Sequence, residues 1–278
     1  MSIKLIAFDL DGTSIVNHWE LPEDNRRALL AAAERGVMLV PATGRMRDFL
    51  PPAVLELPVG HAITSNGGAV FDLLTGEAII ENLIPSQLAL RLHKVLSKYK
   101  IYMEYYFKGS PITQKDMRDW ALAGGVPQGK QWLIVEKSYT YTRDLEETLS
   151  EARLCPEKVN LPYIPQDIRE ELFEELAAIG GLRITSSIAD NMEINAEAAH
   201  KGAALLELAK RLGLKQEELF AIGDNGNDLT MLEAAGCSVA VEDGNELAKA
   251  AARYVTAPHD AGGLARAIER FVLGAGEE

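Results

Sequence analysis

The chain begins with a short apolar segment that stops at two aspartates. Residues 3–8 are apolar apart from Lys4, and Asp9 and Asp11 follow at once, one residue apart and ahead of Gly12. An apolar, β-branched run of this length predicts a buried strand. In an open α/β sheet, ligands bind just beyond the carboxyl ends of the strands. We therefore expect a parallel sheet that carries reactive carboxylates at this edge.

Both ends of the chain alternate between predicted strands and helices, whereas the middle differs in composition. This alternation predicts an α/β fold with a doubly wound parallel sheet. Aromatic residues concentrate between positions 99 and 141, and a separate α/β domain of suitable length is expected there. We predict a core from residues 1–82 and 189–278, with an inserted domain at 83–188. In detail, the insert is expected to hold strands at 101–107, 132–137, 157–161 and 182–187, and the core strands to resume at Met192-Glu193-Ile194.

The overall charge and the cysteines limit the class of partner. The net charge of −13 argues against a general nucleic-acid or anionic-membrane surface. Cys155 and Cys237 are isolated from one another, which favours a reducing compartment over a disulfide framework. No stretch approaches the roughly 20 apolar residues of a membrane span, and the first apolar run is too short for a signal peptide. We expect a cytoplasmic monomer or homodimer without nucleic-acid or membrane partners.

A second acidic segment, Gly223-Asp224-Asn225-Gly226-Asn227-Asp228, also follows an apolar run. Asp224 and Asp228 are four residues apart, so both can face one cleft from the first turn of a helix. Helix capping is the alternative for this segment, and a strand-ending turn is the alternative for Asp9 and Asp11. A calcium loop starting at Asp9 is excluded, because such a loop needs a glycine where this chain has Ser14.

Converging carboxylates need a compensating positive charge. Each close pair repels by about 1–4 kcal/mol at about 4 Å, depending on the effective dielectric constant. A hard divalent cation such as Mg²⁺, which prefers oxygen ligands, resolves this repulsion. Thr43-Gly44-Arg45 offers a hydroxyl, a backbone N–H and a guanidinium for a phosphate group. Lys201 at a predicted helix start indicates a nearby anion, although a solvated surface lysine is the simpler reading of any single lysine.

Taken together and in this order, these segments resemble the four motifs of the haloacid dehalogenase (HAD) superfamily. The motifs are Asp9-Leu10-Asp11-Gly12-Thr13, Thr43, Lys201, and Gly223-Asp224 with Asn227-Asp228. The insertion between the second and third motifs, and the form of the fourth, are similar to Cof-type phosphatases. The resemblance implies a Rossmann-like HAD core with a large α/β cap domain that sets substrate specificity.

The resemblance also implies a role for each motif residue in a two-step phosphoryl transfer. Asp9 is expected to be the nucleophile that forms an aspartyl-phosphate, and Asp11 the general acid and base. Phosphate is expected to contact Thr43, Lys201, Asn227 and the backbone near Leu10 and Gly44. Mg²⁺ is expected on Asp9, the main-chain carbonyl of Asp11, and Asp224, with Asp228 orienting a metal-bound water.

The substrate is not defined by these motifs. The expected activity is hydrolysis of small phosphorylated metabolites, such as sugar phosphates or phosphorylated cofactors. A phosphotransferase or phosphomutase shares every motif, and a non-catalytic phosphate sensor is a third possibility. Arg45 and Asn66, at predicted strand ends, are candidates for substrate contact. Ser14 and the bulky loop Val16-Asn17-His18-Trp19 depart from the family pattern, and we attribute them to variation at the substrate entrance.

Overall fold

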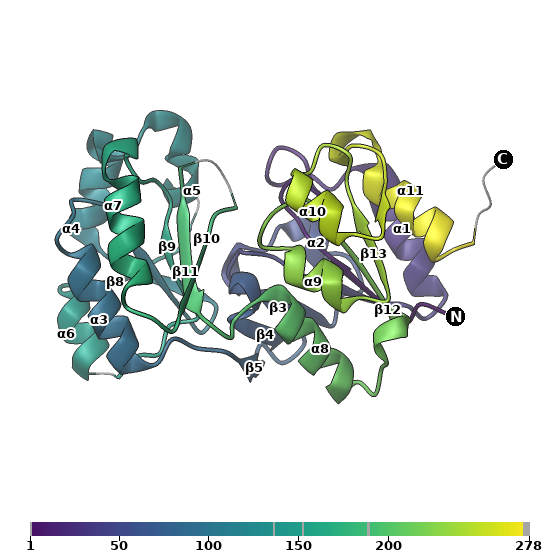
Figure 1. The fold of residues 1–278 in the computed structure, drawn as a ribbon, viewed down its shortest axis with the longest axis horizontal. Coiled ribbons are helices and arrows are strands. Elements are labelled where there is room, and N and C mark those ends of the chain that lie inside the picture. The colour runs from purple at the N-terminus through teal and green to yellow at the C-terminus, as the bar shows by residue number, and fades with distance from the viewer. Residues whose placement is uncertain (1, 136, 152, 188–189, 275–278) are drawn as a thin grey trace. The chain divides into compact units, whose positions relative to one another are not determined.

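A computed structural model describes residues 2–135, 137–151, 153–187 and 190–274. The chain divides into two structural units, which are described separately below (Figure 1). The first unit comprises the chain up to Arg45, Leu50–Ile80, and the chain from His200 onward. The second comprises Met46–Phe49 and Glu81–Ala199.

The opening apolar run forms an inner strand of the first unit. It is β1 (Leu5–Phe8), and its four residues are fully buried. A run that is apolar at every position suits a parallel strand covered on both faces. The sheet has five strands, all paired in parallel. Their order is β14 (Tyr254–Val255), β13 (Cys237–Ala240), β12 (Leu219–Gly223), β1 and β2 (Met38–Pro41).

Helices cover both faces of this sheet, as predicted for a doubly wound fold. Ile6 and Phe8 point into one apolar cluster, whereas Leu5 and Ala7 point into another on the opposite face. The first cluster includes α1 (Glu23–Glu34), α2 (Pro52–Leu55) and α11 (Gly263–Phe271). The second includes α8 (Lys201–Arg211), α9 (Leu229–Ala234) and α10 (Glu246–Ala251). Figure 1 shows α1 beside α11 and α8 beside α9.

A small three-stranded sheet, in which β3 and β4 pair antiparallel, extends the first unit after β2. It consists of β3 (His61–Thr64), β4 (Ala69–Asp72) and β5 (Ala78–Glu81). A parallel bridge between Ala42 and Ile63 joins the end of β2 to β3. The turn between β3 and β4 therefore lies near the carboxyl edge of the main sheet.

The second unit is built on a six-stranded sheet. Its order is β10 (Leu182–Thr185), β11 (Met192–Ala196), β9 (Lys158–Leu161), β6 (Glu104–Phe107), β7 (Ser110–Gln114) and β8 (Thr140–Thr142). All pairs are antiparallel except β7 with β8. One face packs on α3 (Ser86–Leu96), α6 (Leu145–Glu151) and α7 (Gln166–Ala177). The segment after β7 forms α4 (Lys115–Trp120) and α5 (Trp132–Val135).

The other face of this second sheet is polar. Residues alternate along each strand, so Val159 and Ile194 join the apolar cluster while their neighbours point away from it. On the polar face, Asn160 Nδ2 donates a 3.1 Å hydrogen bond to Glu104. Lys158 Nζ lies 2.9 Å from Glu193 on the adjacent strand. The charged groups on this face are thus paired across strands.

Two expectations for the inserted region were wrong. Residues 132–137 were predicted to be a strand, of which residue 136 lies outside the described residues. Trp132–Val135 is a short helix, because Ile134 packs into a cluster with Tyr102 that overrides local β propensity. The segment at 192–194 was expected to resume the core. Instead it is β11 in the sheet of the second unit, because its alternating pattern pairs it antiparallel with β9 and β10.

A buried histidine in the second unit makes its stability depend on pH. His93 on α3 hydrogen-bonds through Nδ1 to the Tyr105 hydroxyl at 2.9 Å, and burial lowers the pKa of His93. The folded state therefore favours the neutral ring. The contribution of neutral His93 to the free energy of unfolding is complete above the unfolded-state pKa of about 6.5, and it is lost as the pH falls below that value. We expect wild-type protein to lose more unfolding free energy than His93→Gln between pH 7.5 and 5.5, measured by urea denaturation.

Tyr105→Phe is the control for this prediction, since it removes the hydrogen bond and leaves the titrating ring. It should keep the wild-type pH dependence at a lower overall stability. Parallel curves for wild type and His93→Gln would contradict the assignment.

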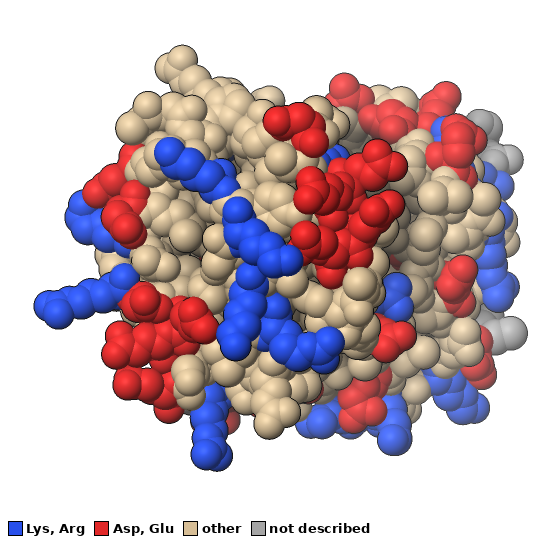
Figure 2. Space-filling view, turned by 60° about the vertical axis from the view of Figure 1, so that its left-hand side comes forward, with Lys and Arg blue, Asp and Glu red and all other residues tan. Residues whose placement is uncertain are grey.

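The surface carries charges of both signs. Figure 2 shows Lys and Arg side chains gathered in one area of the visible face and Asp and Glu in others. The net charge of −13 is therefore not spread evenly. Within the described residues, no helix has the length and apolar character needed to span a membrane.

Candidate active site

The carboxyl ends of β1, β2 and β12 bring the sequence motifs together. The backbone N–H of Asp9 donates to the carbonyl of Ile222 on β12 at 3.0 Å. On the other side, Ala42 N–H donates to the Phe8 carbonyl at 2.8 Å. Asp9 therefore leaves the sheet between the strand that leads to Asp224 and the strand that leads to Thr43. Parallel pairing in this register brings these residues together at the carboxyl edge of the sheet, where the sequence predicted the site.

Lys201 is the buried cation of the site. It is the first residue of α8, whose preceding residue His200 caps the helix by accepting a hydrogen bond from Ala203 N–H. Its Nζ lies 2.5 Å from Asp9 Oδ1 and 2.7 Å from Asp228 Oδ1, and the residue is fully buried. Burial alone would lower the pKa of Lys201, but the two carboxylates raise it overall. The lysine is therefore held in its charged form.

One lysine does not balance the three carboxylates around it. Burial, together with repulsion from Asp228 and Asp224, raises the pKa of Asp9 well above its usual value despite the attraction of Lys201. Burial and Asp228 likewise raise the pKa of Asp224 to about 6. Thr13 Oγ1 donates a 2.9 Å hydrogen bond to Asp224 Oδ1 and so stabilises its charged form. This role of Thr13 was not predicted.

Asp228 holds the fourth motif in shape. Its Oδ2 accepts hydrogen bonds from the backbone N–H groups of Asp224 at 2.9 Å and Asn225 at 3.1 Å. Its Oδ1 faces Lys201, so both oxygens have partners. Asp228 is the N-cap residue of α9, but its side chain makes no capping hydrogen bond to that helix. It orders the preceding loop and takes part in the charge cluster.

The donor set suits a hard divalent cation. Asp9, Asp224 and Asp228 offer carboxylate oxygens that lie within 4.8 Å of one another. Repulsion between them, together with the raised pKa values of Asp9 and Asp224, indicates a deficit of positive charge. Oxygen donors of this kind fit Mg²⁺. The three carboxylates therefore fit the expected Mg²⁺.

Asp11 is held apart from this cluster by Arg45. The guanidinium makes a two-pronged contact, with Nε 2.8 Å from Asp11 Oδ2 and Nη2 2.7 Å from Oδ1. Burial would raise the pKa of Asp11, but hydrogen bonds from Arg45 and His18 lower it far below its usual value. In this structure Arg45, expected to contact substrate, pairs with Asp11.

The bulky loop after the first motif supports this pair. The Trp19 ring lies under the Arg45 guanidinium at 4.8 Å, and the His18 carbonyl accepts a 2.6 Å hydrogen bond from Arg45 Nη2. Ser14 donates to the main-chain carbonyl of Asp9, and its own carbonyl accepts from Asn25 Nδ2 at 3.0 Å. The departures at Ser14 and Trp19 therefore lie within the site. Both were expected as variation at the substrate entrance, and their partners could not be derived from the sequence.

The second motif joins the turn that contains Asn66. Thr43 Oγ1 accepts the Arg45 N–H at 3.1 Å, and the Thr43 carbonyl accepts the Asn66 N–H at 3.0 Å. Asn66 in turn accepts a 3.2 Å hydrogen bond from Asn227 Nδ2 of the fourth motif. Ser65 and Asn66 both have left-handed backbone, which costs roughly 1–2 kcal/mol per non-glycine residue. Asn66 was expected at a strand end as a candidate for substrate contact, and its left-handed backbone was not predicted.

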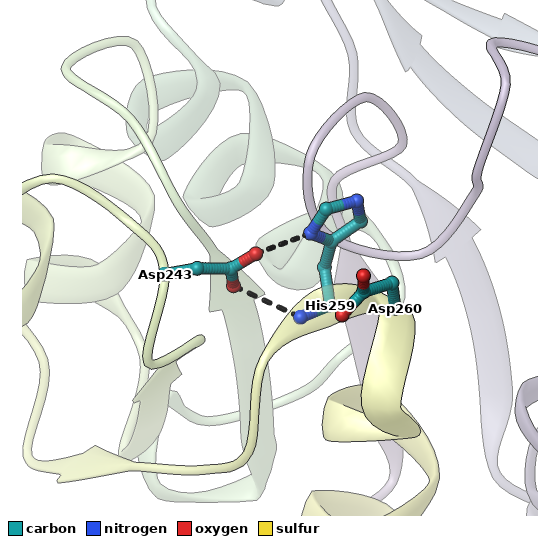
Figure 3. A group of neighbouring side chains, drawn as sticks. All are labelled: Asp243, His259 and Asp260. Carbon is teal, nitrogen blue, oxygen red and sulfur yellow. Dashed lines mark hydrogen bonds and ion pairs between the residues drawn. The ribbon is translucent and has the colours of Figure 1, made fainter.

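A second group of possible metal ligands lies elsewhere in the first unit (Figure 3). Asp243 Oδ2 is 2.5 Å from His259 Nδ1, and Asp243 Oδ1 accepts the His259 backbone N–H at 2.9 Å. Burial would raise the pKa of Asp243, but these hydrogen bonds lower it. The contacts tie the loop after β13 to the turn before α11, and Asp260 lies exposed beside them. The Asp243–His259 contacts therefore hold these two segments of the first unit together.

The fold and the site define an α/β protein with a cluster of buried carboxylates and a lysine at the carboxyl ends of its parallel strands. The chain belongs to the haloacid dehalogenase-like hydrolases, whose family model matches residues 6–268. The resemblance to the Cof-type phosphatases of this superfamily is thereby confirmed, as is the doubly wound α/β fold with its additional α/β unit.

Curated relatives and solved structures agree with this assignment. The chain is 29% identical over 274 residues to the 5-amino-6-(5-phospho-D-ribitylamino)uracil phosphatase YcsE of Bacillus subtilis, covering 98% of this chain and 97% of the relative. It is 28% identical to the pyridoxal phosphate phosphatase YbhA of Escherichia coli, covering 98% and 100%. A solved structure of a haloacid dehalogenase-like hydrolase from B. subtilis superposes with a TM-score of 0.80 at 26% identity, covering 97% and 100%. The protein is a hydrolase of phosphoric monoesters.

Proposed function

We propose that the chain is a Mg²⁺-dependent phosphatase that acts on small phosphorylated metabolites through an aspartyl-phosphate on Asp9. The observation that carries this proposal is the buried Lys201, whose Nζ lies between Asp9 Oδ1 and Asp228 Oδ1 at the carboxyl edge of the sheet. A fixed cation beside a carboxylate is what a phosphoryl group needs when its charge spreads in the transition state.

In the first half of the reaction, a carboxylate oxygen of Asp9 attacks phosphorus and the bond from phosphorus to the substrate oxygen breaks. Asp11 donates a proton to the departing alkoxide, which leaves as an alcohol. In the second half, Asp11 takes a proton from water as the water oxygen attacks phosphorus, which frees Asp9 and phosphate. The pair with Arg45 corresponds to the charged Asp11 that exists between the two steps. The first step needs a protonated Asp11, so Arg45 has to release it when substrate binds, and the proton taken from water in the second step regenerates the acid.

The remaining motif residues hold the phosphoryl group. Lys201 neutralises its charge, Thr43 and the backbone N–H groups near Leu10 and Gly44 donate hydrogen bonds, and Asn227 completes the set. Asp9, the main-chain carbonyl of Asp11, and Asp224 would hold Mg²⁺, with Asp228 beside them. When bound, Mg²⁺ supplies positive charge that offsets the repulsion between the carboxylates and the phosphate.

The substrate class is supported by the two named relatives, which act on a ribityl phosphate and on pyridoxal phosphate. Both substrates are small phosphomonoesters with different leaving groups. We therefore propose the class of small phosphomonoesters for this chain, and no single compound. The test is phosphate release from a panel of sugar phosphates, ribityl phosphates and pyridoxal phosphate. Several compounds should be hydrolysed in Mg²⁺; failure with all of them would overturn the proposed substrate class.

Removal of Mg²⁺ should have two measurable effects. We expect chelation with EDTA to lower activity at least about tenfold and to lower Tm, because the cation binds the folded site alone. Added Mg²⁺ should restore both. In Asp224→Asn, which lacks one proposed ligand charge, Mg²⁺ should raise Tm much less than in wild type. Full activity after exhaustive chelation, with no Mg²⁺-dependent change in Tm, would rule out the metal.

A further inference from the structure

The turn between β3 and β4 has an unusual backbone. Ser65, Asn66 and Gly67 follow one another with φ values of 52°, 57° and 92°. Glycine adopts this left-handed region readily and asparagine tolerates it, whereas serine rarely does. Strain of this kind persists where the surrounding structure fixes it, and it occurs often at functional sites. The turn therefore needs an explanation beyond chain reversal.

Contacts with two phosphate-site motifs hold the turn in place. Ser65 N–H donates to the Arg45 carbonyl at 2.8 Å, and Asn66 N–H donates to the Thr43 carbonyl at 3.0 Å. On its other side, a Cβ built on Gly67 would lie 2.4 Å from the carbonyl oxygen of His200, the residue before Lys201. The turn is thus packed between the second motif and the helix that carries the buried lysine.

The left-handed backbone delivers the Asn66 side chain to Asn227. Asn66 is 3% exposed and its Oδ1 accepts the 3.2 Å hydrogen bond from Asn227 Nδ2. Asn227 is 9% exposed, and its Oδ1 is buried with no hydrogen-bond partner among the described residues. A buried acceptor without a donor is unfavourable, so a donor is expected to reach it in the working enzyme.

We propose that Asn66 is a positioning residue that sets the direction of the Asn227 amide toward the phosphoryl group, an inference that rests on the proposed function. An amide both donates and accepts, and its last torsion has two nearly equivalent states. If both amides turn by half a rotation, Asn66 Nδ2 donates to Asn227 Oδ1. The buried acceptor is then satisfied, and Asn227 Nδ2 is released to donate to a phosphoryl oxygen.

Two substitutions of Asn66 separate this role from simple packing. Asn66→Asp has the same shape but only accepts, so it would hold Asn227 Nδ2 and leave Oδ1 facing the phosphate. Asn66→Gly keeps the left-handed backbone without strain and leaves Asn227 without a partner. A charge-assisted hydrogen bond of the kind at stake corresponds to about 10-fold to 100-fold in binding.

The probe is inorganic phosphate, titrated into the full-length protein in Mg²⁺ by calorimetry, with KM and kcat measured on one good substrate. We expect phosphate to bind about tenfold more weakly to Asn66→Gly and still more weakly to Asn66→Asp, with KM raised in the same order. Asn66→Ala should match Asn66→Gly in phosphate affinity but have a lower Tm, because alanine strains the left-handed position. This pair separates backbone strain from the amide.

Two outcomes would overturn the proposal. One is wild-type phosphate affinity and KM in Asn66→Gly, and the other is wild-type affinity in Asn66→Asp. Phosphate titration needs no turnover, so this result is independent of the proposed reaction. If wild-type protein binds phosphate but releases none from any substrate, the proposed function fails and the role of Asn66 in binding is still decided.

Discussion

Asp9→Asn is expected to lower kcat by about 10³-fold or more, since a neutral amide is a poor nucleophile and removing a covalent catalyst has effects of this size or larger. The fold should survive, because the substitution is isosteric, relieves repulsion with Asp224 and Asp228, and leaves Lys201 paired with Asp228. The measurements are kcat on the best substrate of the panel, and Tm. The control is Asp24→Asn on α1, an exposed carboxylate outside the site, which should keep wild-type activity.

An active Asp9→Asn protein with a normal Tm would remove Asp9 from the nucleophile role. A variant that is inactive and unfolded would instead assign Asp9 to structure. Because its carboxylate is buried and its pKa is raised, we expect Tm to be unchanged or higher without Mg²⁺.

Lys201→Met is expected to cause the largest loss of stability among single substitutions in the site. It leaves Asp9 and Asp228 buried without their shared cation. Removing one partner of a buried ion pair typically costs about 3–5 kcal/mol. The free energy of unfolding, measured with urea in the absence of Mg²⁺, should fall by about this amount, and activity should be lost with it.

Lys210→Met is the matched control for this experiment. It lies on the same helix, α8, but its side chain is 82% exposed and its nearest carboxylate is 4.0 Å away. Surface pairs of this kind contribute about 0–1 kcal/mol. If both substitutions change the unfolding free energy equally, the buried charge cluster is not what Lys201 stabilises.

The sequence located the edge of the sheet where the site forms, because apolar runs that stop at polar motifs mark strand ends. Asp9, Asp224 and Thr43 follow strands β1, β12 and β2, and parallel pairing must bring them to one edge. Lys201 was harder to judge. Only its position at a helix start, where a cation is unfavourable, distinguished it from a surface lysine.

Contacts between distant side chains could not be derived in this way. Nothing in the local pattern pairs Arg45 with Asp11 or places Trp19 beside the guanidinium. The left-handed turn at Ser65 was hidden for a similar reason, since its conformation depends on carbonyls from another motif. The assignment of β11 also failed because an apolar, alternating run does not reveal which sheet it joins.

Chemical trapping of the aspartyl-phosphate tests whether Asp9 is the nucleophile. The protein is mixed with Mg²⁺ and substrate, quenched with acid and reduced with borohydride, which converts an acyl-phosphate to an alcohol. Peptide mass spectrometry then locates the modified residue. We expect substrate-dependent reduction at Asp9. Reduction at another carboxylate, or complete turnover without any modified Asp9 peptide, would contradict it.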